Sequence, residues 1–280
     1  PFRTTFPIGP EARQLESTPT LPALKPPLIR NPVVLGARVV SRMAWAGLGF
    51  LLYGLQLPAA LLGRPGWAAQ LMTLASAVAL RALGVQVVVD DSQPSEKPGT
   101  PLVHIFNHRS PCDGLVIQAV LKLPGLTTAQ LYLKWVLPGY AAAARNAGSA
   151  VLDHRQPQSR LAGLMSASTL LRDHGEIMIA PNGSLVTPIE ERVSSSPWML
   201  AQHYGGSIVP WVFRYEGLDG TVGARYKPLR LLLNRLTAPL GTIHCRRGRS
   251  SDLQLPEDPR DRDGFSCAVQ EYYREKQDQR

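Results

Sequence analysis

The longest uncharged run of the chain constrains its fold more than any other feature. Residues 43–63 contain no Asp, Glu, Lys or Arg and are flanked by arginines. As a helix, these 21 residues would be roughly 31 Å long, enough to cross a hydrocarbon core of about 30 Å. The turn signal Pro65-Gly66 separates this run from a second uncharged run at residues 67–80. Together the two runs predict a helical hairpin over residues 38–84.

Three placements of this hairpin are open. Pro58 should kink or break the first helix, and the second run has only 14 residues, some of them polar. Trp45, Tyr53 and Trp67 suit a membrane interface, and arginines at both ends of the apolar runs leave the orientation undecided. These features favour a monotopic hairpin, partly embedded in a membrane, over one true span. A buried helix pair in a soluble protein is the third alternative.

Composition narrows the class of protein. The chain has 30 Lys and Arg against 21 Asp and Glu, a net charge of +9, and only 18% of its residues are charged. It is too apolar to be disordered and not apolar enough for a polytopic membrane protein. Its basic residues are dispersed and form no nucleic-acid motif, so anionic lipid or phosphate suits them better than nucleic acid. Three cysteines without CxxC spacing argue against a zinc site and favour a reducing compartment.

The pattern along the chain divides it into four parts. Residues 1–37 form a Pro-rich arm, either a free tail or an extended segment that lies along a protein partner. The hairpin follows, and residues 85–250 alternate β-rich and helical runs, which predicts an α/β domain. Residues 251–280 predict a polar tail with a surface helix. Within the domain we expect strands over 85–89, 102–106, 151–152, 177–180 and 208–213, and helices over 112–121, 159–172 and 198–204.

A group of polar residues follows the predicted strand 102–106. Asn107, His108 and Arg109 come directly after it, and Asp113 lies near the start of the next helix. Ligands of open α/β sheets bind at the carboxyl ends of strands. A His–carboxylate pair suits proton abstraction, because the carboxylate fixes the imidazole tautomer and stabilises the imidazolium that forms. The spacing alone is weak evidence, since roughly a quarter of such a match is expected by chance.

Three further motifs give this pair its context. They are a Gly…Asp-His-Arg block at residues 148–155, the block Ala180-Pro181-Asn182-Gly183-Ser184-Leu185, and an apolar block with a central proline at residues 208–212. In this order the four motifs resemble the signatures of the glycerolipid acyltransferase family, which includes the lysophosphatidic acid and glycerol-3-phosphate acyltransferases. Lys134 and Pro138-Gly139 also fall where this family has a lysine and a Pro…Gly turn. The resemblance covers about residues 40–215 and implies a mixed central sheet flanked by helices, with an N-terminal membrane-associated hairpin.

The resemblance also implies an activity. His108 would be the general base and Asp113 would orient it while an acceptor hydroxyl attacks the thioester of acyl-CoA or acyl-carrier protein. This chemistry needs no metal and no bound cofactor. The acceptor would be a lysophospholipid or a related lyso-lipid. Its phosphate would lie near Arg109, Arg155, Asn182, Gly183 and Ser184.

The third motif departs from the family pattern. The family's glutamate is Asn182 here and its arginine is Leu185, and a leucine cannot pair with a phosphate. Either the acceptor lacks a glycerol phosphate, or the activity is weakened or lost. The alternative function is therefore an acyltransferase-like accessory subunit of a membrane protein complex. The Pro-rich arm and the start at Pro1, which would fit a cleaved organellar precursor, favour this alternative.

The expected location follows from these points. We expect a membrane-associated protein, monotopic or with one span, on the reducing side of its membrane, with an organellar membrane as one candidate. Its partners would be membrane lipid, the acyl donor and proteins along the N-terminal arm, and not nucleic acid.

A few other residues have simpler interpretations. His104 falls on a strand face and is expected in the core, and Cys112 is expected as a small buried side chain rather than a nucleophile. Residues 246–249, Arg-Arg-Gly-Arg, would either bind phosphate or lipid headgroups or form a solvated loop.

Overall fold

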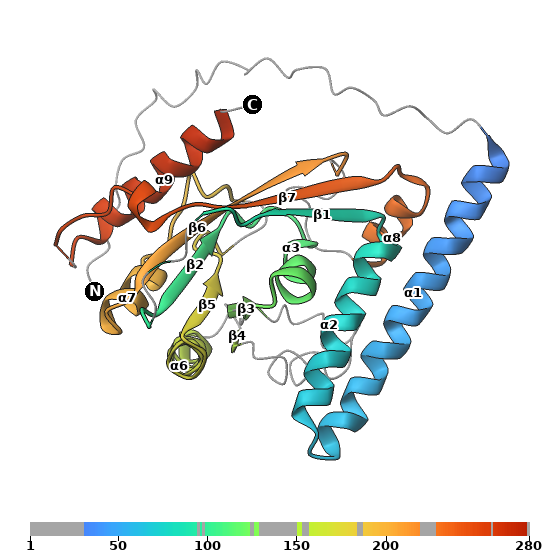
Figure 1. Cartoon of the computed structure of the whole chain (residues 1–280), viewed down its shortest axis with the longest axis horizontal. Coiled ribbons are helices and arrows are strands. Elements are labelled where there is room, and N and C mark those ends of the chain that lie inside the picture. The colour runs from blue at the N-terminus through green and yellow to red at the C-terminus, as the bar shows by residue number, and fades with distance from the viewer. Residues whose placement is uncertain are drawn as a thin grey trace, which may run out of the picture.

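The computed structural model describes residues 31–93, 96, 99–123, 126–128, 150–152, 157–183, 187–218, 228–258 and 260–278. The predicted N-terminal arm lies outside the described residues as far as residue 30. The chain begins with a long hairpin, α1 (Pro32–Leu61) and α2 (Pro65–Ala82), which stands beside a sheet covered by helices on both faces (Figure 1).

The first helix of the hairpin does not break at Pro58. It stays helical to Leu61, and the backbone N–H of Leu62 still reaches the Pro58 carbonyl at 2.9 Å. The proline lies in the last turn, so few helical residues follow it that its ring could displace. Pro65 begins α2 and occupies a first-turn position that suits its missing N–H.

The central sheet is mixed, as the resemblance implied. Its strands are β1 (Val85–Asp90), β2 (Leu102–Phe106), β5 (Glu176–Ile179), β6 (Ser207–Glu216) and β7 (Gly241–Arg247), in the order β1-β7-β6-β2-β5. β6 and β7 pair antiparallel, and the other neighbours pair parallel. A separate parallel pair joins β3 (Leu126–Thr128) to β4 (Ala150–Leu152).

Side-chain alternation gives the sheet two apolar faces. Val103 and Ile105 of β2 point to one face, which α6 (Pro157–His174), α7 (Ser196–His203) and α9 (Arg262–Asp278) cover. Phe106 points to the other face, where the end of α2 and the segment after β2 pack. That segment is α3 (Asp113–Val116), which continues as a π-helical turn, η1 (Ile117–Leu121). The remaining helices are α8 (Pro228–Thr237) and the 3-10 turn η2 (Ser250–Asp252).

The C-terminal helix α9 packs against the sheet through one apolar face. Phe265, Val269, Tyr272 and Tyr273 lie on one face of α9 and are buried in the same cluster as the strands. The Tyr273 hydroxyl donates to the backbone of β2 and β6, 3.0 Å from each carbonyl oxygen. Helical spacing of four large residues makes a stripe wide enough to cover a sheet, so this helix completes the α/β core.

The structure also gives the basic residues 246–249 a definite place. Arg246 and Arg247 end β7, and each lies beside an acidic residue at the end of β1. Arg246 Nε is 3.6 Å from the Asp90 carboxylate, and Arg247 Nη1 is 3.1 Å from that of Asp91. Two of the three arginines therefore lie beside carboxylates, at the end of a strand rather than in a loop.

Two buried arginines join the hairpin to the domain. Arg42 of α1 donates to the carbonyls of Arg235, Leu236 and Ala238 at the end of α8, with 2.7 Å to Ala238. Arg235 in turn donates to Leu83 at the end of α2, 3.0 Å away, and to other carbonyls beside it. The guanidiniums thus satisfy carbonyls that helix ends leave without partners.

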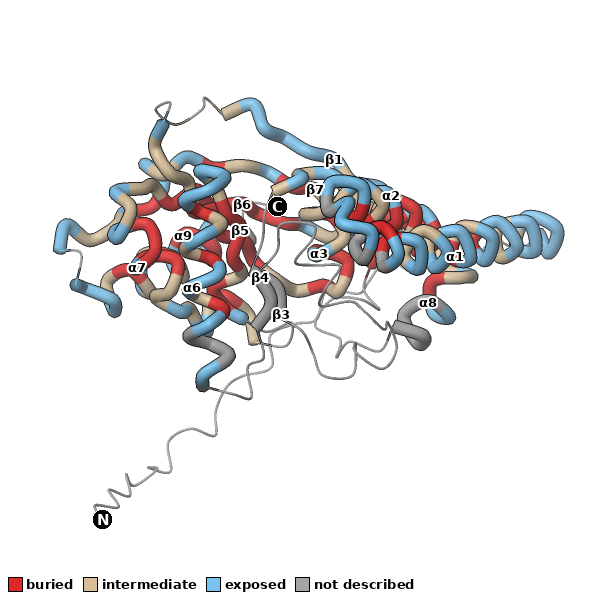
Figure 2. Tube along the Cα trace, turned by 90° about the horizontal axis from the view of Figure 1, so that it is seen from below, coloured by how far each residue is buried: buried red, intermediate tan, exposed pale blue. Residues whose placement is uncertain are grey.

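Most of α1 is exposed (Figure 2). Residues Pro32–Gln56 are the one described helix segment long and apolar enough to cross a membrane; their mean hydropathy is 1.3, and 6% of the 18-residue window that qualifies is buried. Most of α1 is therefore not buried within this chain.

Candidate active site

The candidate site is built where β2 ends. After Phe106, the Asn107 side chain turns to the neighbouring strand and bonds both backbone groups of Phe213, with 2.9 Å to the carbonyl and 2.7 Å from the N–H. The amide thus replaces one step of the strand ladder where β2 has stopped. This contact fixes the position at which the chain leaves the sheet, one residue before His108.

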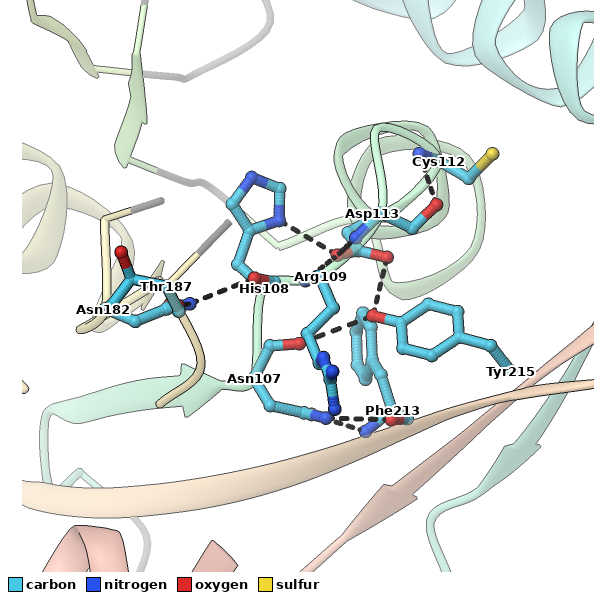
Figure 3. A network of polar contacts seen from close by, with 10 residues as sticks. Asn107, His108, Arg109, Cys112, Asp113, Asn182, Thr187, Phe213 and Tyr215 are labelled. Atoms are coloured by element: carbon cyan, nitrogen blue, oxygen red, sulfur yellow. Dashed lines mark hydrogen bonds and ion pairs between the residues drawn. The ribbon is translucent and has the colours of Figure 1, made fainter. Parts of the chain in front are cut away.

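His108 and Asp113 are in direct contact. The His108 Nδ1 and Asp113 Oδ2 atoms are 2.8 Å apart, and the other ring nitrogen points away from the carboxylate (Figure 3). The Asp113 side chain is fully buried, whereas a quarter of the His108 side chain is exposed. A carboxylate is an acceptor, so Nδ1 carries the proton and Nε2 presents its lone pair to the exposed side.

The Asp113 carboxylate is held by the loop that leads to it. The backbone N–H groups of Arg109 and Ser110 each donate to Oδ2 over 3.0 Å. Asp113 is also the first residue of α3, where the partial positive charge of the helix start favours a carboxylate. A charge buried this deeply is tolerated because donors surround it.

Tyr215 is a member of the site that the sequence analysis missed. Its hydroxyl lies 3.0 Å from Asp113 Oδ1 and 3.3 Å from the Asn107 carbonyl oxygen. Burial, and then the nearby Asp113 charge, raise the pKa of Tyr215 well above its ordinary value. One signal could have found it, because strand alternation puts residue 215 on the sheet face of Trp211 and Phe213, where a polar group is unexpected.

The Asn182 side chain contacts the backbone of the site. Its side chain is buried, and its amide donates to the His108 carbonyl at 2.9 Å and to the Thr187 carbonyl at 3.0 Å. Both amide hydrogens are therefore directed to backbone carbonyls. The third motif and the first are joined by this side chain.

The other expected phosphate-binding residues are only partly described. Gly183 is exposed with a φ of +60°, and its N–H bonds the Ala180 carbonyl at 3.2 Å. Arg109 is half-buried next to His108. Arg155 and Ser184 lie outside the described residues, as do Leu185, Lys134 and Pro138-Gly139.

Two titratable residues near the site are part of the core, as expected. Cys112 is fully buried, and burial raises the pKa of its thiol to about 12. His104 is buried as well, and its ring nitrogens contact Trp211 Nε1 at 3.1 Å and a Glu176 oxygen at 3.3 Å. Among the described residues, no group of three His, Cys, Asp or Glu side chains is arranged to hold a metal ion.

Comparisons with known proteins bear on the family and the fold. The acyltransferase family model matches residues 85–214, a range that includes all four motifs. The fold is similar to the crystal structure of PlsC from Thermotoga maritima, a 1-acyl-sn-glycerophosphate (LPA) acyltransferase. The two are 16% identical with a TM-score of 0.57, over 88% of this chain and 97% of that one. No curated protein matches the chain by sequence.

An acyltransferase family model thus matches the part of the chain that carries the four ordered motifs, as those motifs predicted. The fold is that of a solved 1-acyl-sn-glycerophosphate acyltransferase.

Proposed function

We propose that the protein transfers an acyl chain from acyl-CoA or acyl-carrier protein to the hydroxyl of a lysophospholipid or related lyso-lipid. The observation that carries this proposal is the His108–Asp113 contact of 2.8 Å, at the end of a strand in an acyltransferase domain. The printed activity of PlsC, whose fold is similar, supports a lyso-lipid as acceptor.

The chemistry follows from the orientation of the imidazole. His108 Nε2 takes the proton of the acceptor hydroxyl as its oxygen attacks the thioester carbonyl, and a tetrahedral oxyanion forms. When this intermediate collapses, the carbon–sulfur bond breaks and the imidazolium returns the proton to the leaving thiolate. Asp113 stabilises the imidazolium between the two steps. The products are the acylated lipid and the free thiol of the donor.

The hairpin supports membrane association. Phe50, Leu51 and Trp67 are large apolar side chains with 57, 60 and 66% of their surface exposed. Arg42 is held in the domain at the end of α8, so the tip of the hairpin is the part free to enter lipid. We therefore propose a monotopic hairpin that docks the domain on the membrane containing the acceptor.

A direct test compares the wild-type protein with His108→Ala. We expect thioester consumption to depend on a lyso-lipid acceptor and to fall by about a thousandfold or more in the variant. Mass spectrometry of the lipids identifies the product and its acceptor. His174→Ala, an exposed histidine on α6, is the matched control. Folded wild-type protein that turns over no acceptor would refute the proposal.

Membrane docking is tested separately with vesicles. Phe50→Ser combined with Leu51→Ser should reduce flotation with anionic phospholipid vesicles, because it removes exposed apolar surface from α1. Met165→Ser with Met199→Ser, on exposed sites of α6 and α7, is the control for lost surface hydrophobicity. Equal flotation of both variants would exclude the hairpin as the docking element.

One observation favours the second candidate, an accessory subunit without turnover. The Asn182 donors face backbone carbonyls, and Leu185 stands where the family has an arginine. Purification in mild detergent separates the candidates. A stable complex that contains this chain and lacks acyl transfer would support the accessory subunit, and an active monomer would exclude it.

A further inference from the structure

We propose that Tyr215 is a positioning residue which, through Asp113, sets the pH range over which His108 works as a base. The inference rests on the proposed function, because it assigns a role to a residue of the same site. No motif of the resemblance includes residue 215, and the contact arises only from the pairing of β6 with β2.

The geometry divides the two carboxylate oxygens between two tasks. Oδ2 accepts hydrogen bonds from His108 Nδ1 and from the backbone N–H groups of Arg109 and Ser110. Oδ1 receives the Tyr215 hydroxyl, at 3.0 Å. The carboxylate is fully buried, so a rotation that turned Oδ2 away from His108 would break the contact with Tyr215 as well. The hydroxyl therefore fixes the plane of the carboxylate that orients the imidazole.

The hydroxyl is also a permanent donor. It has one proton, and the charged oxygen of Asp113 is a better and nearer acceptor than the Asn107 carbonyl at 3.3 Å. Because the pKa of Tyr215 lies well above its ordinary value, the hydroxyl keeps its proton at any pH at which an enzyme would work.

Other ionisable groups around the carboxylate do not compete with this contact. Cys112 on the same loop and Cys245 on β7 have thiols whose pKa burial raises to about 12, so both are neutral. Arg109 lies on the same loop. The positive charge of Arg235 on α8 lowers the pKa of Cys112, against the larger effect of burial. His108 and Asp113 are thus the pair that Tyr215 adjusts.

The direction of the effect follows from electrostatics. A donor on Oδ1 withdraws negative charge from the carboxylate, which then attracts a proton on the imidazole less strongly. Tyr215 therefore helps to keep His108 neutral, and able to accept a proton, at lower pH than Asp113 alone would allow. Without the hydroxyl, the imidazolium is favoured and the base is lost at higher pH.

The first test needs no turnover. The histidine ring signals of Tyr215→Phe are followed by NMR against pH, and the His108 signal is identified by its loss in His108→Ala. We expect the titration of His108 to move to higher pH by about half a unit or more. Tyr273→Phe, which removes another buried tyrosine hydroxyl, is the matched control and should leave it unchanged. An unshifted His108 titration in folded Tyr215→Phe would overturn the inference.

A second substitution retains the hydroxyl, so the inference can still be tested if Tyr215→Phe folds poorly. Replacing Tyr215 with 3-fluorotyrosine makes the phenol a stronger donor with little change in volume. We expect the His108 titration to move the opposite way, to lower pH. A shift in the same direction as for Tyr215→Phe, or no shift, would contradict the inference.

Kinetic measurements then distinguish the proposed acyl transfer from the positioning role of Tyr215. In Tyr215→Phe the acidic limb of kcat/KM against pH should move to higher pH and kcat should fall about three- to tenfold, while KM for both substrates changes little. If the His108 titration shifts in Tyr215→Phe but the wild-type protein has no turnover, the proposed function is refuted and the coupling of Tyr215 to His108 is supported. If the wild-type protein turns over and Tyr215→Phe changes neither the His108 titration nor the pH profile of kcat/KM, only the role of Tyr215 is refuted.

Discussion

The side chain of Asn107 and the backbone of Phe213 are joined by two hydrogen bonds that run in opposite directions. This contact binds the end of β2 to β6 where ordinary strand pairing stops. Tyr215 lies two residues further along β6 and contacts Asp113. The same strand therefore holds both ends of the loop that carries His108.

Asn107→Asp should destabilise the protein. The aspartate can still accept from the Phe213 N–H, but it places an oxygen against the buried Phe213 carbonyl and buries a charge. We expect a loss of about 2–4 kcal/mol in the free energy of unfolding, measured by urea denaturation. Asn234→Asp, at an exposed position of α8, makes the same chemical change and should have little effect. Similar losses in both variants would mean that the contact with Phe213 adds no stability.

Asn182→Glu should lower activity although it restores the residue type of the family motif. The glutamate has no donor for the His108 and Thr187 carbonyls, which the amide now satisfies. We expect kcat/KM to fall by about tenfold or more, since each buried carbonyl left without a donor costs about 1–3 kcal/mol. Gln202→Glu on α7 adds the same charge at an exposed position and should leave activity unchanged. An increase in activity would show that Asn182 faces the acceptor.

Native protein should react with maleimide at one cysteine. Cys267 is exposed, whereas Cys112 and Cys245 are buried with thiol pKa values of about 12. The thiolate is the reactive form, so raising the pH from 7 to about 9 should not label the two buried cysteines. Mass spectrometry should find one label on native protein and three after denaturation. Rapid labelling of Cys112 in native protein would show an accessible thiolate there and make Cys112 a candidate nucleophile.

Arg235→Met should weaken the joint between the hairpin and the domain. Methionine fills much of the volume but leaves the carbonyls of Leu83, Gly217 and Pro239 without their donor. We expect the free energy of unfolding to fall by about 2–4 kcal/mol, with a lower Tm in a calorimetric scan. Arg192→Met, at an exposed position, is the control. If Arg235→Met is as stable as the wild type, apolar packing alone holds the hairpin to the domain.

Local patterns predicted the elements whose environment is uniform along their length. The strand expected over 102–106 is β2 with the same bounds, and the helix expected over 159–172 is the centre of α6. β7 was missed because its basic residues suggested a loop. They are acceptable in a strand because the register places Arg246 opposite Asp90.

The sequence by itself determined the hairpin, the α/β domain and the His108–Asp113 pair, because each depends on residues close together in the chain. The tertiary structure decided what acts on that pair. Tyr215, Asn182 and Phe213 lie about 70 to 110 positions from His108 in the chain. Strand order and register bring these residues to the site, and neither can be read from spacing, because pairing depends on the competition among all strands for partners.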